Sequence, residues 1–190
     1  SVSLPAFDQS HVDASAEATA ELLRAEGLDV EIVREGGAPA VIGHIAGPEG
    51  APTVMLYAHH DVQPPGDDAD WDSAPFEPTE RDGRLSVKFM EPMEEVIYLD
   101  QGRAHSGNLP VGVTVFVEGE EEVGSDSLLT ILERHGDKLR ADAIVLADSM
   151  NWDIGTPALT TTLRGLVRVV VTVSTLDHGV HSGMFGGAVP

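Results

Sequence analysis

The spacing of apolar residues along the first half of the chain predicts one helix followed by several strands. Within Ala14–Ala25, the side chains of Ala16, Ala20 and Leu23 recur at i, i+4 and i+7, which is typical of an amphipathic helix, and Gly27 is placed to end it. Short apolar runs bounded by turn-forming residues predict strands. These runs are Leu28–Val33, Ala40–Ile45, Thr53–Ala58, Val111–Glu118 and Ala143–Ala147.

A second helix and a long loop complete this part of the chain. Residues Ser125–His135 predict a helix, with Ser125 or Asp126 as its N-cap and Gly136 at its end. Residues His59–Arg84 are interrupted by Pro, Gly and Asp, which indicates a long ordered or functional loop without a helix or strand of its own. Because strand, loop, helix and strand follow one another in this order, the sequence predicts a layered α/β fold.

The sequence pattern changes near the C-terminal end of the chain. Two β-rich runs, Leu159–Leu163 and Leu166–Ser174, lie on either side of Gly165. We therefore expect one domain over residues 1–157 and the beginning of a second over residues 158–190.

Composition and charge restrict the partners of the protein. The 190 residues include 32 acidic and 11 basic side chains, for a net charge of −21, and 42% of them are hydrophobic, enough for a folded core. A surface with this negative net charge repels phosphate backbones and anionic lipid headgroups. We therefore expect neither a nucleic acid nor a membrane as a partner. Without an apolar run of about 20 residues or a signal segment, we expect a soluble, cytoplasmic protein. The chain begins at Ser1 without Met and ends at Pro190 without a polar tail, so we expect both ends to be cut.

Residues able to bind metal follow three of the predicted strands. His59-His60-Asp61 comes after one strand, the acidic run Glu118–Ser125 leaves another, and Asp148 follows a third. Loops at the carboxyl ends of strands carry the sites of open α/β sheets. Taken singly, these features are also explained as a loop that contains His, a solvated acidic turn and a turn-forming Asp. Together they predict a site for two metal ions that activates water, with zinc, manganese or cobalt as candidates.

Absent residues and motifs narrow the chemistry further. The chain has no cysteine, which excludes disulfides, thiol nucleophiles and thiolate metal sites. It also lacks the Gly-x-Ser-x-Gly, His-Glu-x-x-His and phosphate-loop motifs. A further candidate, His181, lies in the Gly-rich segment Asp177–Gly183, where an oxyanion donor and an ordinary surface histidine both fit the pattern.

Five segments taken together resemble the M20 family of metallopeptidases, which includes glutamate carboxypeptidases and carnosinases, and most closely its dipeptidase-like branch. The matching segments are Leu56–Pro64 (LYAHHDVQP), Trp71–Phe76 (WDSAPF), Glu118–Ser125 (EGEEEVGS), Leu146–Asp148 and His181–Gly187. The resemblance implies a zinc-peptidase-like, three-layer α/β catalytic domain with an inserted α+β lid domain that begins near Ala158. It also implies a homodimer formed through the lid, in which His181 binds the substrate.

The same resemblance implies roles for the residues that follow the strands. His59 and Asp148 match ligands of one metal ion, Glu122 matches a ligand of the other, and Asp61 matches the residue that orients His59. Glu121 matches the general base that takes a proton from water. The implied cofactors are two divalent metal ions, zinc first, with manganese or cobalt as alternatives.

One segment departs from the family. Where family members carry an Asp that bridges both metals, this sequence has Pro92, within a dissimilar stretch from Ser86 to about Asn108. Proline cannot bind a metal, and Glu91, Glu94 or Glu95 would replace the Asp only with a shifted backbone. The family's remaining histidine ligand follows the lid and lies beyond these 190 residues.

These observations favour a metal-dependent hydrolase of the M20 type that cleaves a peptide or amide bond in a dipeptide or an N-acyl amino acid. An N-acyl-amino-acid or diaminopimelate deacylase is an alternative enzyme. A catalytically degenerate M20-like fragment that acts as a binding or structural module is the alternative outside enzymes, and Pro92 favours it.

Overall fold

The structure is a computed structural model that describes residues 1–81, 84–86, 108–146, 148, 152–153, 155–173, 178–179, 181 and 184. The chain divides into two compact units, Ser1–Ser149 and Met150–Pro190. The predicted domain boundary between residues 157 and 158 stays a prediction.

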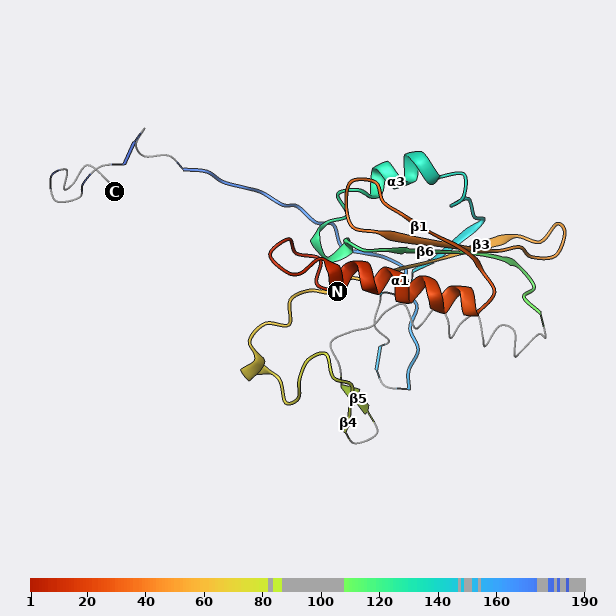
Figure 1. Ribbon diagram of the computed structural model, residues 1–190, viewed down its shortest axis with the longest axis horizontal. Coiled ribbons are helices and arrows are strands. Elements are labelled where there is room, and N and C mark those ends of the chain that lie inside the picture. The colour runs from red at the N-terminus through yellow and green to blue at the C-terminus, as the bar shows by residue number, and fades with distance from the viewer. Residues whose placement is uncertain are drawn as a thin grey trace. The chain divides into compact units, whose positions relative to one another are not determined.

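A five-stranded mixed sheet forms the centre of the unit Ser1–Ser149 (Figure 1). Its strands, in spatial order, are β1 (Asp29–Val33), β2 (Ala40–Ile45), β6 (Gly112–Glu118), β3 (Thr53–His59) and β7 (Ala143–Leu146). β2 pairs antiparallel with β1 and β6, whereas β3 pairs parallel with β6 on one side and with β7 on the other. The carboxyl ends of β6, β3 and β7 therefore lie at the same edge of the sheet.

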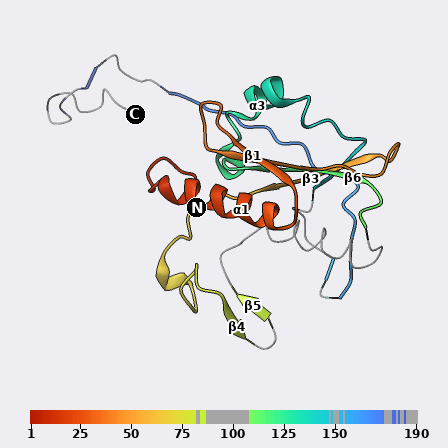
Figure 2. The same cartoon turned by 45° about the vertical axis from the view of Figure 1, so that its right-hand side comes forward.

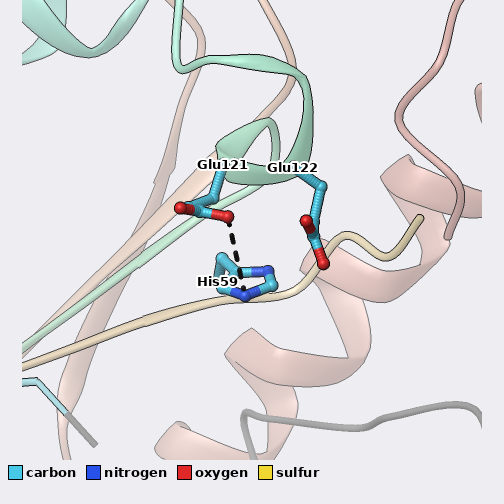
Figure 3. A group of neighbouring side chains, drawn as sticks. All are labelled: His59, Glu121 and Glu122. Carbon is cyan, nitrogen blue, oxygen red and sulfur yellow. Dashed lines mark ion pairs between the residues drawn. The ribbon is translucent and has the colours of Figure 1, made fainter. Parts of the chain in front are cut away.

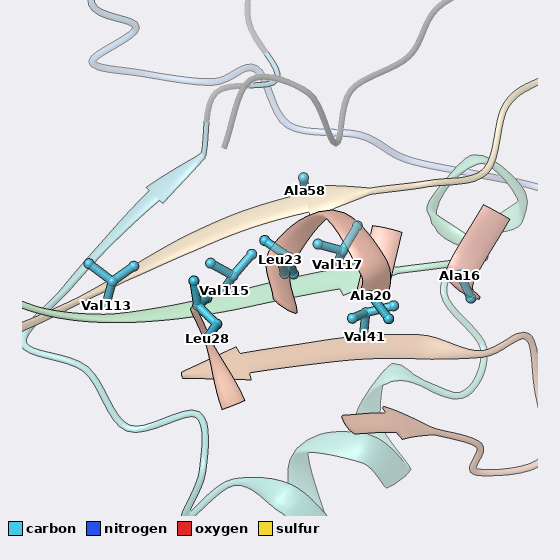
Figure 4. Close-up of a cluster of buried hydrophobic side chains, with 9 residues drawn as sticks. All are labelled: Ala16, Ala20, Leu23, Leu28, Val41, Ala58, Val113, Val115 and Val117. Atoms are coloured by element: carbon cyan, nitrogen blue, oxygen red, sulfur yellow. The ribbon is translucent and has the colours of Figure 1, made fainter. Parts of the chain in front are cut away.

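Helix α1 (Ser10–Ala25) covers one face of this sheet (Figure 4). Its Ala16, Ala20 and Leu23, the predicted apolar face, are fully buried in a cluster with every second residue of β6. Those β6 residues are Val113, Val115 and Val117. Because successive side chains of a strand point to opposite faces, these valines form one surface toward the helix. The predicted helix is confirmed, and it begins four residues earlier than expected, at Ser10.

Helix α3 (Leu128–His135) covers the opposite face, as Figures 1 and 2 show. Ile131 of α3 and Leu139 beyond it are buried in a second cluster with Phe116 of β6, Ile42 of β2 and Met55 of β3. Phe116 alternates with the valines that face α1, so β6 supplies side chains to both clusters. Since the described helices α1 and α3 cover opposite faces of the sheet, the predicted three-layer α/β fold is confirmed.

The start of α3 differs from the prediction. A 3-10 helix, η2 (Glu121–Val123), follows β6, and α3 begins three residues later than expected. Gly124 and Ser125 have φ angles of +109° and +54°, which a right-handed helix cannot contain. The chain therefore turns here, and Ser127 occupies the N-cap position without a side-chain cap hydrogen bond.

The other elements lie near their predicted places. The five strands predicted within Ser1–Ser149 are confirmed to within one residue, with Ala147 outside the described residues. The long loop after β3 contains a 3-10 helix, η1 (Asp68–Asp70), and a two-stranded sheet of β4 (Thr79–Arg81) and β5 (Arg84–Ser86). None of the helices in the described part of the chain has both the length and the apolar character that crossing a membrane requires.

The central and outer strands of the sheet differ in burial. All seven residues of β6 are buried, as expected for a strand covered on both faces. β7, the last strand on the parallel side, is exposed along its length, with Ile144, Val145 and Leu146 at 57%, 45% and 59% exposure. Neither helix cluster includes a residue of β7.

The predicted strands of the second unit are not formed in the described residues. Residues 157–173 adopt neither helix nor strand, so the prediction is wrong for Leu159–Leu163 and for the described part of Leu166–Ser174. Their large apolar side chains are exposed, at 86% for Leu159 and 85% for Leu166. A strand becomes stable only when a neighbouring strand pairs with its backbone, and the described residues of this unit supply none. The lid domain over residues 158–190 stays a prediction.

Candidate metal centre

The sheet edge at which β6, β3 and β7 end carries most of the predicted functional residues. β3 and β6 pair in a register that places His59 opposite Glu118, and the His60 N–H donates to the Glu118 carbonyl at 2.8 Å. The segment His59–Asp61 and the turn Glu120–Glu122 therefore leave adjacent strands side by side. This is the arrangement expected from the order of strands and loops in the sequence.

Three of the predicted side chains gather into one group, which Figure 3 shows. His59, Glu121 and Glu122 each place one candidate ligand atom within 4.8 Å of the others. The Nε2 atom of His59 lies 4.0 Å from Oε2 of Glu121, and His59 is buried while the glutamates are partly exposed. One imidazole nitrogen with carboxylate oxygens is a donor set that zinc, manganese and cobalt accept. The residues present therefore fit a divalent ion.

Asp61 links both halves of this group. The Nδ1 atom of His59 donates to the Asp61 carbonyl at 2.9 Å and lies 3.2 Å from its carboxylate. The two oxygens of the same carboxylate accept the backbone N–H groups of Glu121 and Glu122, each at 3.2 Å. Because the partners of Nδ1 are acceptors, Nδ1 carries the hydrogen and Nε2 is the nitrogen that faces the glutamates. Asp61 therefore acts on the orientation of His59 and of the turn together.

Two carboxylates at this sheet edge, those of Asp61 and Glu121, have pKa values that are shifted in opposite directions. Burial raises the pKa of Asp61, but the hydrogen bond and charge of His59 and the N–H of Glu122 together bring it below the ordinary value. The pKa of Glu121 is raised, first by burial and then by the negative charges of Glu122, Asp148 and Glu118, against the opposing effect of His59. Asp61 is thus held as an anion, whereas Glu121 binds a proton more readily than an ordinary glutamate.

The structure places the other predicted residues less closely. Asp148 is exposed, and its charge acts on Glu121, but it is not among the three side chains of the 4.8 Å group. Glu122 accepts a hydrogen bond from the side-chain amide of Gln63 at 2.7 Å. His181 is exposed within the unit Met150–Pro190. Pro92 lies outside the described residues.

The sequence analysis missed a pair next to the group, the partly buried Tyr57 and the buried Glu118, as part of the site. The Tyr57 hydroxyl donates a short hydrogen bond to the carboxylate of Glu118, which is only 2% exposed. Burial raises the pKa of Tyr57 above its usual range, and the bond to Glu118 raises it further, so Tyr57 remains a donor. Two signals in the sequence could have revealed the pair. Glu118 ends an otherwise apolar strand, and Tyr57 precedes His59 by two residues, on the same face of a strand.

Curated relatives match much of this chain. It is 35% identical over 197 residues to the cysteinylglycine-S-conjugate dipeptidase of Corynebacterium striatum, a match that covers 99% of this chain and 42% of that protein. It is 33% identical over 156 residues to the Beta-Ala-His dipeptidase of Mus musculus, covering 78% of this chain and 32% of that protein. The chain therefore spans less than half the length of these relatives. No protein-family model matches it.

The fold also matches solved structures. The M20 family metallo-carboxypeptidase from Sulfolobus solfataricus superposes with a TM-score of 0.66 at 27% identity, covering 74% of this chain and 33% of that one. The mixed sheet with helices on both faces therefore has the α/β fold of M20 peptidase catalytic domains. The chain is thus similar to these dipeptidases over most of its own length, and its fold is similar to that of the M20 family metallo-carboxypeptidase.

Proposed function

We propose that this protein is a metal-dependent hydrolase of the M20 type that cleaves a peptide or amide bond in a dipeptide or an N-acyl amino acid. The observation that carries the proposal is the group of His59, Glu121 and Glu122 at the carboxyl ends of β3 and β6, with Asp61 bonded to all three residues. The names of the relatives, a cysteinylglycine-conjugate dipeptidase and a Beta-Ala-His dipeptidase, favour a dipeptide.

The proposal gives each residue at the sheet edge a task. His59 and Asp148 would hold one divalent ion and Glu122 a second, with zinc first and manganese or cobalt as alternatives. A bound divalent ion would lower the pKa of water and polarise the substrate carbonyl. Glu121 takes a proton from the attacking water, and its raised pKa makes it a stronger base than an ordinary glutamate. Asp61 keeps Nε2 of His59 turned toward the glutamates.

Three further features of the proposal come from the family resemblance. His181 would bind the substrate, residues 158–190 would begin a lid through which two copies form a homodimer, and the protein would work in the cytoplasm. This chain spans less than half the length of its relatives. Activity is therefore best tested on a longer form of the protein.

Calorimetric titration with zinc and with manganese tests the metal centre in this chain. We expect saturable binding by the parent and a loss of affinity of at least about tenfold in His59→Ala and in Asp148→Ala. Glu133→Ala, which removes an exposed glutamate of α3, is the matched control and should bind as the parent does. Circular dichroism shows whether each variant is folded. A parent chain that binds neither metal would contradict the proposal and favour a degenerate binding module.

A panel of substrates separates the two enzymes that the sequence leaves open. A dipeptidase is expected to hydrolyse Cys-Gly and β-Ala-His faster than N-acetyl amino acids. The reverse order would identify a deacylase. The panel is run on the longest form of the protein that is expressed, with and without added zinc or manganese.

A further inference from the structure

One loop of the sheet holds both segments that carry the candidate ligands. Residues Gly36–Pro39 connect β1 to β2 and lie beside the ends of β3 and β6. His60, next to His59, donates from Nε2 to the carbonyl of Pro39 at 2.8 Å. The N–H of Ala38 donates to Oε2 of Glu120 at 3.0 Å. The loop is therefore bonded to a residue adjacent to each ligand segment.

Glu120 accepts more hydrogen bonds from the protein than a solvent-exposed surface glutamate needs. It is 8% exposed, and its Oε1 accepts the N–H of Ser127 at 2.5 Å while Oε2 accepts the N–H of Ala38. Its backbone carbonyl accepts the N–H groups of Val123 at 3.2 Å and Ser125 at 2.9 Å. Side chain and backbone together close the turn that contains Glu121 and Glu122.

The contacts on both sides of the loop are tight. A Cβ at Gly37 would lie 2.3 Å from Oε2 of Glu120 and 2.8 Å from the Ser127 side chain. A Cβ at Gly119 would lie 2.5 Å from the Pro39 carbonyl and 2.8 Å from the His60 ring. Real Cβ atoms do not approach other atoms so closely, so the loop packs against the two ligand segments with no room for a side chain at either glycine.

We propose that Glu120 is a positioning residue of the metal centre, which fixes the turn carrying Glu121 and Glu122 against the loop Gly36–Pro39. This inference rests on the proposed metal function. Asp61 holds the same turn from the side of β3 through the N–H groups of Glu121 and Glu122. Glu120 holds it through different partners, the N–H groups of Ala38 and Ser127. Loss of the Glu120 carboxylate leaves two backbone donors without their acceptor, so the turn shifts and Glu121 and Glu122 leave their positions.

The test compares Glu120→Ala, Glu120→Gln and the exposed-surface control Glu133→Ala with the parent, with Zn²⁺ affinity measured by calorimetry. We expect Glu120→Ala to bind Zn²⁺ about 10–100-fold more weakly, the range typical when a residue that orients a ligand is removed. Glu120→Gln keeps one carbonyl acceptor and should lie between that variant and the parent. Glu133→Ala should match the parent.

The absorption spectrum of the Co²⁺-saturated protein reports ligand geometry, which a purely structural role for Glu120 would leave unchanged. We expect the Glu120→Ala spectrum to differ from that of the parent at full saturation. A folded Glu120→Ala variant with the affinity and spectrum of the parent would overturn the inference. If Glu120→Ala does not fold by circular dichroism, the same two measurements on Glu120→Gln decide. A parent that binds no metal overturns the proposed function itself, which is a separate result.

Discussion

Two acidic segments of this protein have similar composition and different surroundings. Glu118–Glu122 ends the buried strand β6, and Asp67–Asp70 lies in the loop after β3. In the first segment two glutamates are buried and accept hydrogen bonds from a tyrosine hydroxyl and from two backbone N–H groups. In the second segment all three aspartates are exposed.

This difference shows that several carboxylates close together in the sequence are not enough to form a metal site. The first segment lies where parallel strands end, beside a buried histidine and within reach of the Asp61 carboxylate. Those neighbours fix the positions of carboxylates that would otherwise move apart by mutual repulsion. The acids of the second segment are exposed to solvent. The predictions below test whether this contrast is functional.

The largest expected effect is that of Glu121→Gln on turnover. Gln has the shape of Glu but cannot take a proton, so we expect kcat to fall about 10²–10⁴-fold, as for removal of a general base. Zinc affinity should change much less than kcat. Steady-state kinetics on the form of the protein that hydrolyses dipeptides, with calorimetry beside it, measure both. Turnover that survives the substitution would remove Glu121 from the role of base.

The next effect is that of Asp61→Asn on metal affinity. Asn keeps one oxygen but presents an amide where Asp61 accepts an N–H of the turn, so we expect Zn²⁺ affinity to fall about 10–100-fold. Asp68→Asn makes the same chemical change in the exposed segment and should leave affinity unchanged. Equal losses in the two variants would mean that overall negative charge, and not the arrangement at the sheet edge, attracts the metal.

A smaller effect is expected for Tyr57→Phe. The substitution leaves the buried Glu118 carboxylate without its hydroxyl donor, which should lower the free energy of unfolding by about 1–3 kcal/mol. Urea denaturation of Tyr57→Phe, Glu118→Gln and the double variant gives the coupling between the two side chains. Effects that simply add would show that the pair does not stabilise the protein as a unit.

The smallest effect concerns pH and His60. Burial lowers the pKa of His60 in the folded protein, with the Pro39 carbonyl opposing it, so below about pH 6.5 the unfolded chain binds a proton that the folded chain excludes. Stability is therefore expected to fall as pH drops below that value, by at most about 1.4 kcal/mol per pH unit from this group.

Urea denaturation at pH 7.5 and 5.5 measures this contribution. His60→Gln, which has no titrating group, should lose less stability between the two values than the parent. His44→Gln removes an exposed histidine and should follow the parent. An identical pH dependence in the parent and in His60→Gln would show that His60 protonates without cost in the fold.

The sequence predicted the part of the site that depends on strand order. Parallel strands bring their carboxyl ends to one edge, so His59 and the pair Glu121 and Glu122 could be placed together from the positions of two apolar runs. Glu120 was not separated from its acidic neighbours, because its burial depends on a loop more than 80 residues earlier in the chain. Local composition carries no information about such a distant contact.

The dependence on distant contacts also explains why strands were wrongly predicted in the second unit. The residues from Leu159 to Leu163 have the composition of a strand, but a strand forms only with a partner that local composition does not specify. The start of α3 was misplaced for a different reason. The positive φ angle of Ser125 is uncommon for any residue except glycine, so the sequence favoured a helix where the chain turns.

The exposed strand β7 has a consequence for how the protein behaves in solution. In the described part of the chain β7 is an edge strand, and the unpaired backbone groups of an edge strand can pair with another chain. Three of its apolar side chains are also exposed, which favours such pairing. Repulsion between copies that each carry a charge of −21 opposes such pairing. Because the screening length shrinks from about 30 Å at 0.01 M salt to about 3 Å at 1 M, concentrated salt weakens that protection. Dilute buffer is therefore the condition that best keeps copies of this chain separate.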